Sequence, residues 1–149
     1  MDEPYRESIY IAAVPSAVFE YFTNPSALAC WMGDRAVLDP RPGGQFTLFF
    51  DDRAVVGRYL VVDRPSRLVI SWGRRGSSKL PPGLSTLEVT FTAEGPGTRV
   101  AIAHSGLPRE ERERHALGWR HYLSRLVIAG GGGTVSPHRT PGELTRGAD

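Results

Sequence analysis

Apolar and polar residues alternate most clearly between residues 84 and 104. Leu87, Val89 and Phe91 share one parity, while threonine and glutamate residues occupy the other, a pattern typical of a half-buried β-strand. After the turn at residues 94–97, residues 98–104 resume the alternation and place His104 at the end of an apolar row. This stretch therefore predicts two antiparallel strands joined by a tight turn.

The same pattern predicts five earlier strands, and short turns rich in Gly, Pro, Asp or Ser separate most of them. Those strands are expected at residues 5–12, 36–39, 45–50, 54–62 and 67–72. Short strands joined by tight turns favour an antiparallel meander. In the strand at 54–62 both faces are apolar, so the pattern leaves open which way Arg58 points.

Helical spacing predicts two short helices and one long helix. The short ones follow Pro15 and Pro25, since proline suits a first helical turn, and the first extends to Phe22. The long helix covers residues 109–129 and ends at the glycine run 130–133. Its apolar residues recur every three or four positions, and they are Ala116, Trp119, Tyr122, Leu123, Leu126 and Val127.

Length and composition indicate one α+β domain. The chain has 149 residues, of which 40% are hydrophobic and 23% charged, which is ordinary for a globular protein. We expect the domain to occupy residues 1–133 and a flexible, dispensable tail to follow at 134–149, because the tail is polar and aperiodic. Residues 73–83, rich in glycine and serine, are expected to form an exposed loop.

Several classes of protein are disfavoured by the remaining composition. The N-terminus lacks the features of a signal peptide and no stretch is long and apolar enough to span a membrane, so a soluble, cytoplasmic protein without a membrane partner is expected. The net charge is +2, but arginines alternate with acids, which argues against a nucleic-acid partner. Cys30 is the only cysteine, and the four histidines lack ligand spacing, so neither a metal nor another cofactor is expected.

A series of short segments, taken in order, resembles one known family. They are Val18-Phe19, Asn24-Pro25 and Trp31, Pro42 to Phe46, Gly57-Arg58-Tyr59, Arg67 to Trp72, Gly97-Thr98-Arg99, His104 to Leu107, and Gly118 to Leu123. Together they are similar to the START-like (SRPBCC) superfamily, and within it to the AHSA-like proteins, named after an activator of the heat-shock-protein ATPase. The resemblance covers about residues 5–129.

This resemblance implies a helix-grip fold, in which a curved antiparallel sheet wraps the long C-terminal helix and encloses an apolar cavity. Family members include lipid and hormone carriers, polyketide cyclases and cochaperone domains, so the fold alone does not determine the function. The resemblance supplies no catalytic residues.

Histidine and tyrosine side chains are the candidates for chemistry. His104 shares its parity with inward residues, so it could contact a ligand or act as an acid or base; alternatively, it fixes the junction between the last strand and the helix. Tyr122 could present its hydroxyl to the cavity or simply pack in the core. His121 and His115 lie off the apolar stripe and are expected to face solvent.

We therefore expect the chain to bind a small hydrophobic molecule, aromatic or acyl, without catalysis. The expected lining comes from many separate elements and is largely aromatic and aliphatic; it comprises Trp31, Phe46, Leu48, Trp72, Leu87, Val89, Ile102, His104, Trp119 and Leu123. An enzyme of the cyclase or aromatase type and a chaperone-interacting module are the alternatives, the latter with a protein partner that the sequence does not identify.

Overall fold

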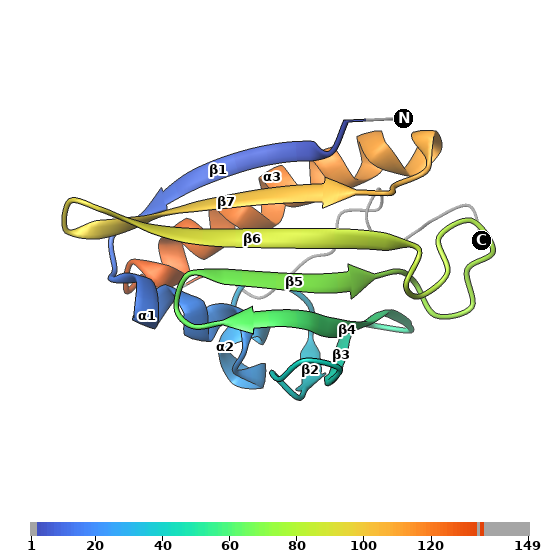
Figure 1. Cartoon of the computed structure of the whole chain (residues 1–149), viewed down its shortest axis with the longest axis horizontal. Coiled ribbons are helices and arrows are strands. Elements are labelled where there is room, and N and C mark those ends of the chain that lie inside the picture. Colours follow the sequence, from blue (N-terminus) through green and yellow to red (C-terminus); the bar gives the residue numbers. More distant parts are fainter. Residues whose placement is uncertain (1–2, 134, 136–149) are drawn as a thin grey trace.

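The computed structural model describes residues 3–133 and 135, and these form one curved sheet with helices against one face (Figure 1). In chain order the elements are β1 (Tyr5–Ile11), α1 (Pro15–Phe19), the 3-10 turn η1 (Glu20–Phe22), α2 (Pro25–Ala29), β2 (Arg35–Leu38), β3 (Gln45–Phe50), β4 (Arg53–Asp63), β5 (Arg67–Trp72), β6 (Ser85–Glu94), β7 (Gly97–Ser105) and α3 (Arg109–Gly130). Every predicted strand is found, with its ends shifted by two residues or fewer. The predicted tail lies outside the described residues, apart from Val135.

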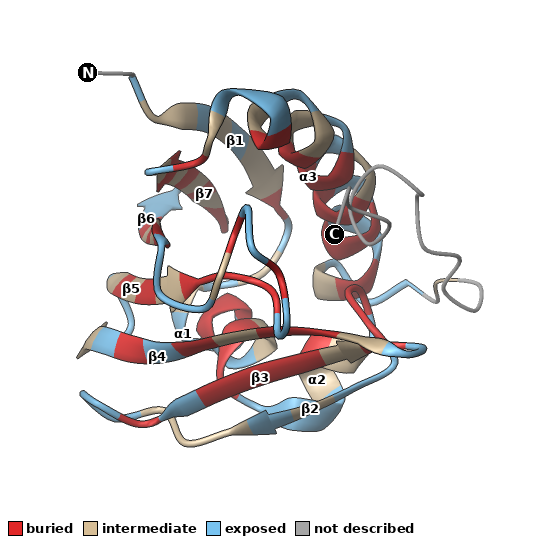
Figure 2. Ribbon diagram, turned by 90° about the vertical axis from the view of Figure 1, so that its right-hand side faces the viewer, coloured by how far each residue is buried: buried red, intermediate tan, exposed pale blue. Residues whose placement is uncertain are grey.

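The seven strands form a single antiparallel sheet in the order β1-β7-β6-β5-β4-β3-β2. From β2 to β7 the chain is a meander, as the tight turns predicted. The first strand then lies beside the last: Tyr5 pairs with His104, and Ile11 pairs with Thr98. Figure 2 shows the sheet curving toward α3. The α+β helix-grip fold expected from the sequence is confirmed.

The junction between β4 and β5 bends the sheet. The pairing register shifts between Tyr59 and Val61, and a bulge of this kind increases local bending and twist. Close by, a Cβ atom on Gly57 would lie 1.7 Å from the carbonyl oxygen of Ser71. The two backbones are therefore so close that only glycine fits at position 57. Arg58, whose direction the sequence left open, is exposed and points away from α3.

The buried face of α3 differs in part from the predicted stripe. Trp119, Tyr122, Leu123 and Leu126 are buried, as predicted. Ala116 is only half-buried and Val127 is exposed, whereas polar residues take their places on the buried face. Those polar residues are Glu111, His115 and Arg125.

The loop between β5 and β6 is not the exposed segment that its composition predicted. Leu80 is fully buried, and Arg74 and Ser77 are also buried. Backbone hydrogen bonds hold the loop, including one from Arg74 to the carbonyl of Leu80 at 2.7 Å. The loop turns inward at Leu80, because the aliphatic side chain of this residue joins the core.

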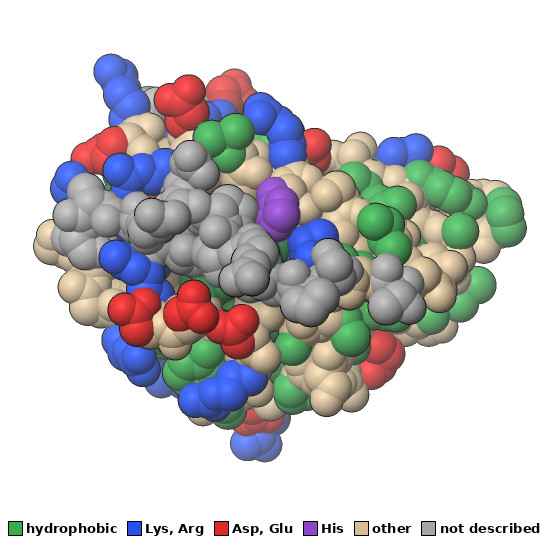
Figure 3. All heavy atoms as spheres, turned by 180° about the vertical axis from the view of Figure 1, so that it is seen from behind, with side chains coloured by type: hydrophobic (Ala, Val, Ile, Leu, Met, Phe, Trp, Pro, Cys, Tyr) green, Lys and Arg blue, Asp and Glu red, His purple; other side chains and the backbone are tan. Residues whose placement is uncertain are grey.

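Apolar side chains are unevenly distributed over the surface seen from behind. Figure 3 shows apolar side chains gathering toward one end, where α1 and the end of α3 lie in Figure 1. Val14, Val127 and Ile128 are among the exposed apolar residues. Within the described residues, no helix is long and apolar enough to cross a membrane.

Candidate functional site

All ten side chains that the sequence placed in a ligand site are buried between the sheet and the helices. They come from the segment after α2 (Trp31), β3 (Phe46, Leu48), β5 (Trp72), β6 (Leu87, Val89), β7 (Ile102, His104) and α3 (Trp119, Leu123). Period-two alternation of the strands turns them to the inner face. Their burial agrees with the predicted positions, while their role in binding stays a prediction.

An aromatic cluster occupies the centre of this interior. The ring of Trp72 lies 5.4 Å from Trp119, 5.9 Å from Phe46 and 5.4 Å from His104, measured between ring centroids. These separations are those of favourable aromatic pairs. Trp31 is not part of this cluster: its ring packs on Phe22, and its Nε1–H donates to the carbonyl of Tyr21.

His104 is held by hydrogen bonds at both ring nitrogens. Trp119 Nε1–H donates to His104 Nδ1 at 3.1 Å, and His104 Nε2 lies 3.0 Å from Ser85 Oγ. An indole N–H can only donate, so Nδ1 accepts and the proton of the neutral ring is on Nε2. The hydroxyl of Ser85 donates a hydrogen bond to the carbonyl of Trp72 at 2.8 Å. Burial, helped by nearby His115, holds the pKa of His104 well below 6.5.

His115 is buried beside His104, so the expectation that it faces solvent is wrong. The two imidazole rings are 5.2 Å apart and perpendicular. Nδ1 of His115 bonds the backbone oxygen of Glu111 at 3.0 Å, and Nε2 accepts from Trp72 Nε1–H at 3.3 Å. Burial lowers the pKa of His115 to about 4, although Glu111 opposes the shift. His121, also expected in solvent, is half-buried.

A buried ion pair between Arg74 and Glu111 lies at the N-terminal end of α3. It completes a polar network that also contains Ser85, His104, His115 and the indoles of Trp72 and Trp119. Arg74 Nη1 and Nη2 donate to the two carboxylate oxygens of Glu111 at 2.9 and 2.8 Å. Burial alone would raise the pKa of Glu111, but hydrogen bonds and charge from Arg74 outweigh burial and lower it. The Nε atom of Arg74 is buried and has no hydrogen-bond partner among the residues that the structure describes.

Sequence reasoning missed the polar members of this network: Arg74, Ser85, Glu111 and His115. A signal existed for His115, because it precedes Trp119 by four residues and therefore shares its helix face. Counting only apolar residues along the helix hid that signal. No comparable signal marked Arg74, which lies in a loop rich in serine and glycine.

The network fixes the hydrogen-bonding roles of both imidazoles. Each ring accepts a hydrogen bond from a tryptophan, and burial favours the neutral form of both rings. Among residues 3–133 and 135, no group of three or more His, Cys, Asp or Glu side chains could hold a metal ion. His138 lies outside the described residues.

The sequence as a whole identifies the family. Residues 12–130 match the family described as Activator of Hsp90 ATPase homolog 1-like protein. The chain belongs to this family. The resemblance to AHSA-like proteins seen in the short segments is thereby confirmed, and the match spans α1 to α3.

Relatives within and around the Activator of Hsp90 ATPase homolog 1-like family share this fold. An AHSA1-like protein from Rhizobium etli, solved by NMR, is 35% identical; the alignment covers 92% of this chain and 90% of that one, with a TM-score of 0.68. The crystal structure of DynU16, from the dynemicin biosynthetic locus, superposes with a TM-score of 0.80 over 95% of this chain and 52% of that one. At 21% identity, DynU16 shows a shared fold alone.

A curated relative whose name refers to a chaperone comes from Dictyostelium discoideum. It is named Activator of 90 kDa heat shock protein ATPase homolog and is 28% identical over 115 residues, which cover 75% of this chain and 29% of that protein. The chain spans about three tenths of the length of the curated relatives it matches.

Proposed function

We propose that this protein binds a small apolar molecule, aromatic or acyl, between α3 and the inner face of the sheet, and that it does so without catalysis. The observation that carries the proposal is the pairing of the polar groups around the aromatic cluster. The indole N–H groups of Trp72 and Trp119 are both used by histidines. The side chains therefore offer a ligand mainly aromatic and aliphatic surface, which is the usual lining of an apolar binding pocket.

The same pairing weighs against an enzyme of the cyclase type. A general base needs a free lone pair and a pKa near the working pH. The acceptor nitrogens of His104 and His115 are both occupied by indole donors, and burial keeps both pKa values low. In this arrangement neither imidazole is available to take a proton from a substrate.

Binding is tested by titrating the full chain with fluorescent fatty acids and flat aromatic probes while tryptophan emission is recorded. Trp31, Trp72 and Trp119 are all buried, so a ligand beside the aromatic cluster should quench them. Saturable quenching with a dissociation constant below roughly 100 µM, about 5.5 kcal/mol, is expected. Probes that never saturate would contradict the proposal.

Two substitutions on α3 locate the site. Leu123 is buried, whereas Leu117 on the same helix is 44% exposed. Leu123→Ala should change probe affinity several-fold because it alters the shape of the interior, and Leu117→Ala should leave it unchanged. Equal effects of the two substitutions would place the probe outside the interior. His104→Ala then shows whether His104 contacts the ligand.

A second candidate is a protein-binding role on a chaperone of the Hsp90 class. The relative from D. discoideum, named as a homologue of an activator of the 90 kDa heat shock protein ATPase, supports it. Exposed apolar side chains of Val14 and Ile128 also offer a surface. Stimulation of Hsp90 ATPase activity that Ile128→Ser abolishes, and that the control Leu60→Ser on β4 preserves, would favour this candidate.

A further inference from the structure

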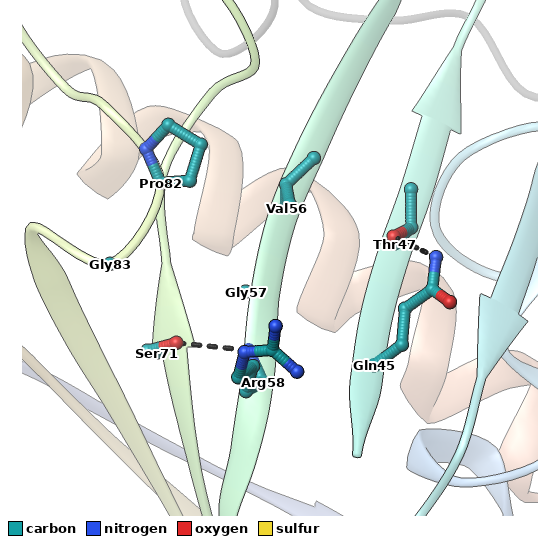
Figure 4. A pocket seen from close by; sticks show the side chains of 8 residues that line it. All are labelled: Gln45, Thr47, Val56, Gly57, Arg58, Ser71, Pro82 and Gly83. Carbon is teal, nitrogen blue, oxygen red and sulfur yellow. Dashed lines mark hydrogen bonds between the residues drawn. The ribbon is translucent and has the colours of Figure 1, made fainter. Parts of the chain in front are cut away.

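A pocket of about 480 Å³ opens on the outer face of the sheet, across the strands from the aromatic cluster (Figure 4). Gln45 and Thr47 on β3 pair with Arg58 and Val56 on β4. Residues that pair across antiparallel strands share a face, and the adjacent residues of these strands, among them Phe46, are buried on the inner face. The pocket is therefore separated from the interior by the sheet itself.

Some of the hydrogen-bond donors that line this pocket have no acceptor among the described residues. Ser71 Oγ accepts the backbone N–H of Arg58 at 2.9 Å, and Thr47 Oγ1 accepts Gln45 Nε2–H at 2.9 Å. Each hydroxyl keeps its own proton to donate, and no described residue takes it. Arg58 Nη1 donates to the carbonyl of Gly43 at 3.0 Å. That bond orients the guanidinium and leaves Nε and Nη2 without an acceptor among the described residues.

Arg58 is the one charged residue that lines the pocket, and no carboxylate is among its lining residues. Arg35 and Arg75 flank the ring of Phe49, with their Cζ atoms 3.8 and 5.9 Å from its centroid. Phe49 has the same parity as Thr47 on β3, so these arginines extend the cationic surface along the outer face. A cationic surface of this kind attracts anions over several ångströms.

The opposite wall is apolar. Val56 and Pro82 lie on the side of the pocket away from the guanidinium of Arg58 (Figure 4). A ligand that fits both parts must combine an anionic group with a hydrocarbon or aromatic portion. The volume is within the usual range for small-molecule sites, about 300–1,000 Å³.

We propose that this outer pocket binds a small organic anion, a carboxylate or a phosphate ester. Arg58 forms the charge-assisted hydrogen bonds, the Ser71 and Thr47 hydroxyls donate to the remaining oxygens, and Val56 and Pro82 contact the apolar part. Such a site is distinct from the proposed apolar interior, and the two can be occupied independently.

The test uses the full chain labelled with 15N and four probes: phenyl phosphate, benzoate, inorganic phosphate and neutral benzyl alcohol. Phenyl phosphate or benzoate should give saturable amide shifts confined to the pocket segments of β3, β4 and β5 and to Gly83. The probe that binds tighter identifies the preferred anionic group. Inorganic phosphate should bind more weakly than phenyl phosphate, since it lacks the apolar part. Equal shifts with benzyl alcohol would overturn the proposal.

Arg58→Gln should weaken binding about ten-fold, as expected for the loss of a charge-assisted contact. Arg67→Gln is the matched control, because it removes the same charge at a different place. Arg67 lies on β5 and forms an ion pair with Glu88. Raising the salt concentration should weaken binding by the anions. If Arg58→Gln binds like the wild type, or if both variants lose affinity equally, the pocket is not the site.

Discussion

Ser71 and Trp72 are neighbours on β5, and their side chains lie on opposite sides of the sheet in different surroundings. The indole N–H of Trp72 is buried and donates to His115, whereas Ser71 lines a surface pocket and no described residue accepts the proton of its hydroxyl. Burial of an unpaired polar group is costly, so the inner side pairs its donors within the protein. On the outer side water can satisfy them, which leaves those donors free to exchange water for a ligand.

The substitution expected to lower the stability of the inner side most is Trp119→Ala. This change opens a cavity in the core and leaves His104 Nδ1 without its donor, so a loss of about 3–5 kcal/mol in the free energy of unfolding is expected. Urea denaturation measures it. Trp119→Phe keeps most of the ring but not the N–H, and it should cost less. A midpoint near the wild type for Trp119→Ala would mean that the indole is not an essential part of the core. Leu117→Ala on the exposed side is the control.

Glu111→Ala is expected to destabilise the fold by about 3–5 kcal/mol, because it leaves the charge of Arg74 buried and unpaired. The double variant Arg74→Met/Glu111→Leu should be more stable than Glu111→Ala, since no buried charge remains. Thermal and urea unfolding of the double variant and of its two single components, Arg74→Met and Glu111→Leu, form a double-mutant cycle. A double variant that is as unstable as the sum of the single ones would show that the two residues act independently.

Acidification should weaken the inner network before any other part of the fold. The folded pKa of His115 is about 4, below the ordinary value of 6.5, so the unfolded chain binds more protons between these values. Stability is therefore complete above about pH 6.5 and falls as the pH drops toward 4, by roughly 3 kcal/mol for this group. His104, with its lowered pKa, adds to the loss.

The pH dependence is measured as the urea midpoint from pH 7.5 to 4. His115→Phe removes one titrating group, so its stability should fall less steeply across that range. An unchanged slope in His115→Phe would show that other groups, such as Glu111, determine the acid response.

A substitution on the outer side of the sheet should change the stability least. Arg58→Gln alters an exposed side chain with one hydrogen bond to Gly43, so the free energy of unfolding should change by no more than about 0.5 kcal/mol. The same urea titration checks it. A larger loss would mean that Arg58 supports the β3–β4 pairing and is not simply available for binding.

Periodicity predicted most of the fold, because strands such as β6 have a clear inner row of apolar residues. Leu87, Val89 and Phe91 are all buried, as their alternation indicated. The long helix was also placed within one residue. These predictions succeeded because they depend on local spacing and on the burial of apolar area, both of which are visible in the chain.

The polar part of the interior was not predictable by the same rules. His115 and Glu111 are buried because partners from β5 and the following loop satisfy them, and those partners are distant in sequence. The outer pocket was hidden for a different reason. Apolar residues occupy both faces of β4, and the register shift after Tyr59 interrupts its alternation, so the direction of Arg58 could not be read from the pattern.

The pairing of β1 with β7 has a consequence for how the chain folds during synthesis. Residues 5–11 leave the ribosome early, but their partners at 98–104 follow only after nearly the whole sheet has been made. Until then, β1 has no partner strand and Ile11 is not covered by the finished core. Contacts between such distant segments slow folding and expose nascent edges to aggregation. The meander from β2 to β7 can assemble hairpin by hairpin, whereas closure by β1 must wait for the last strand.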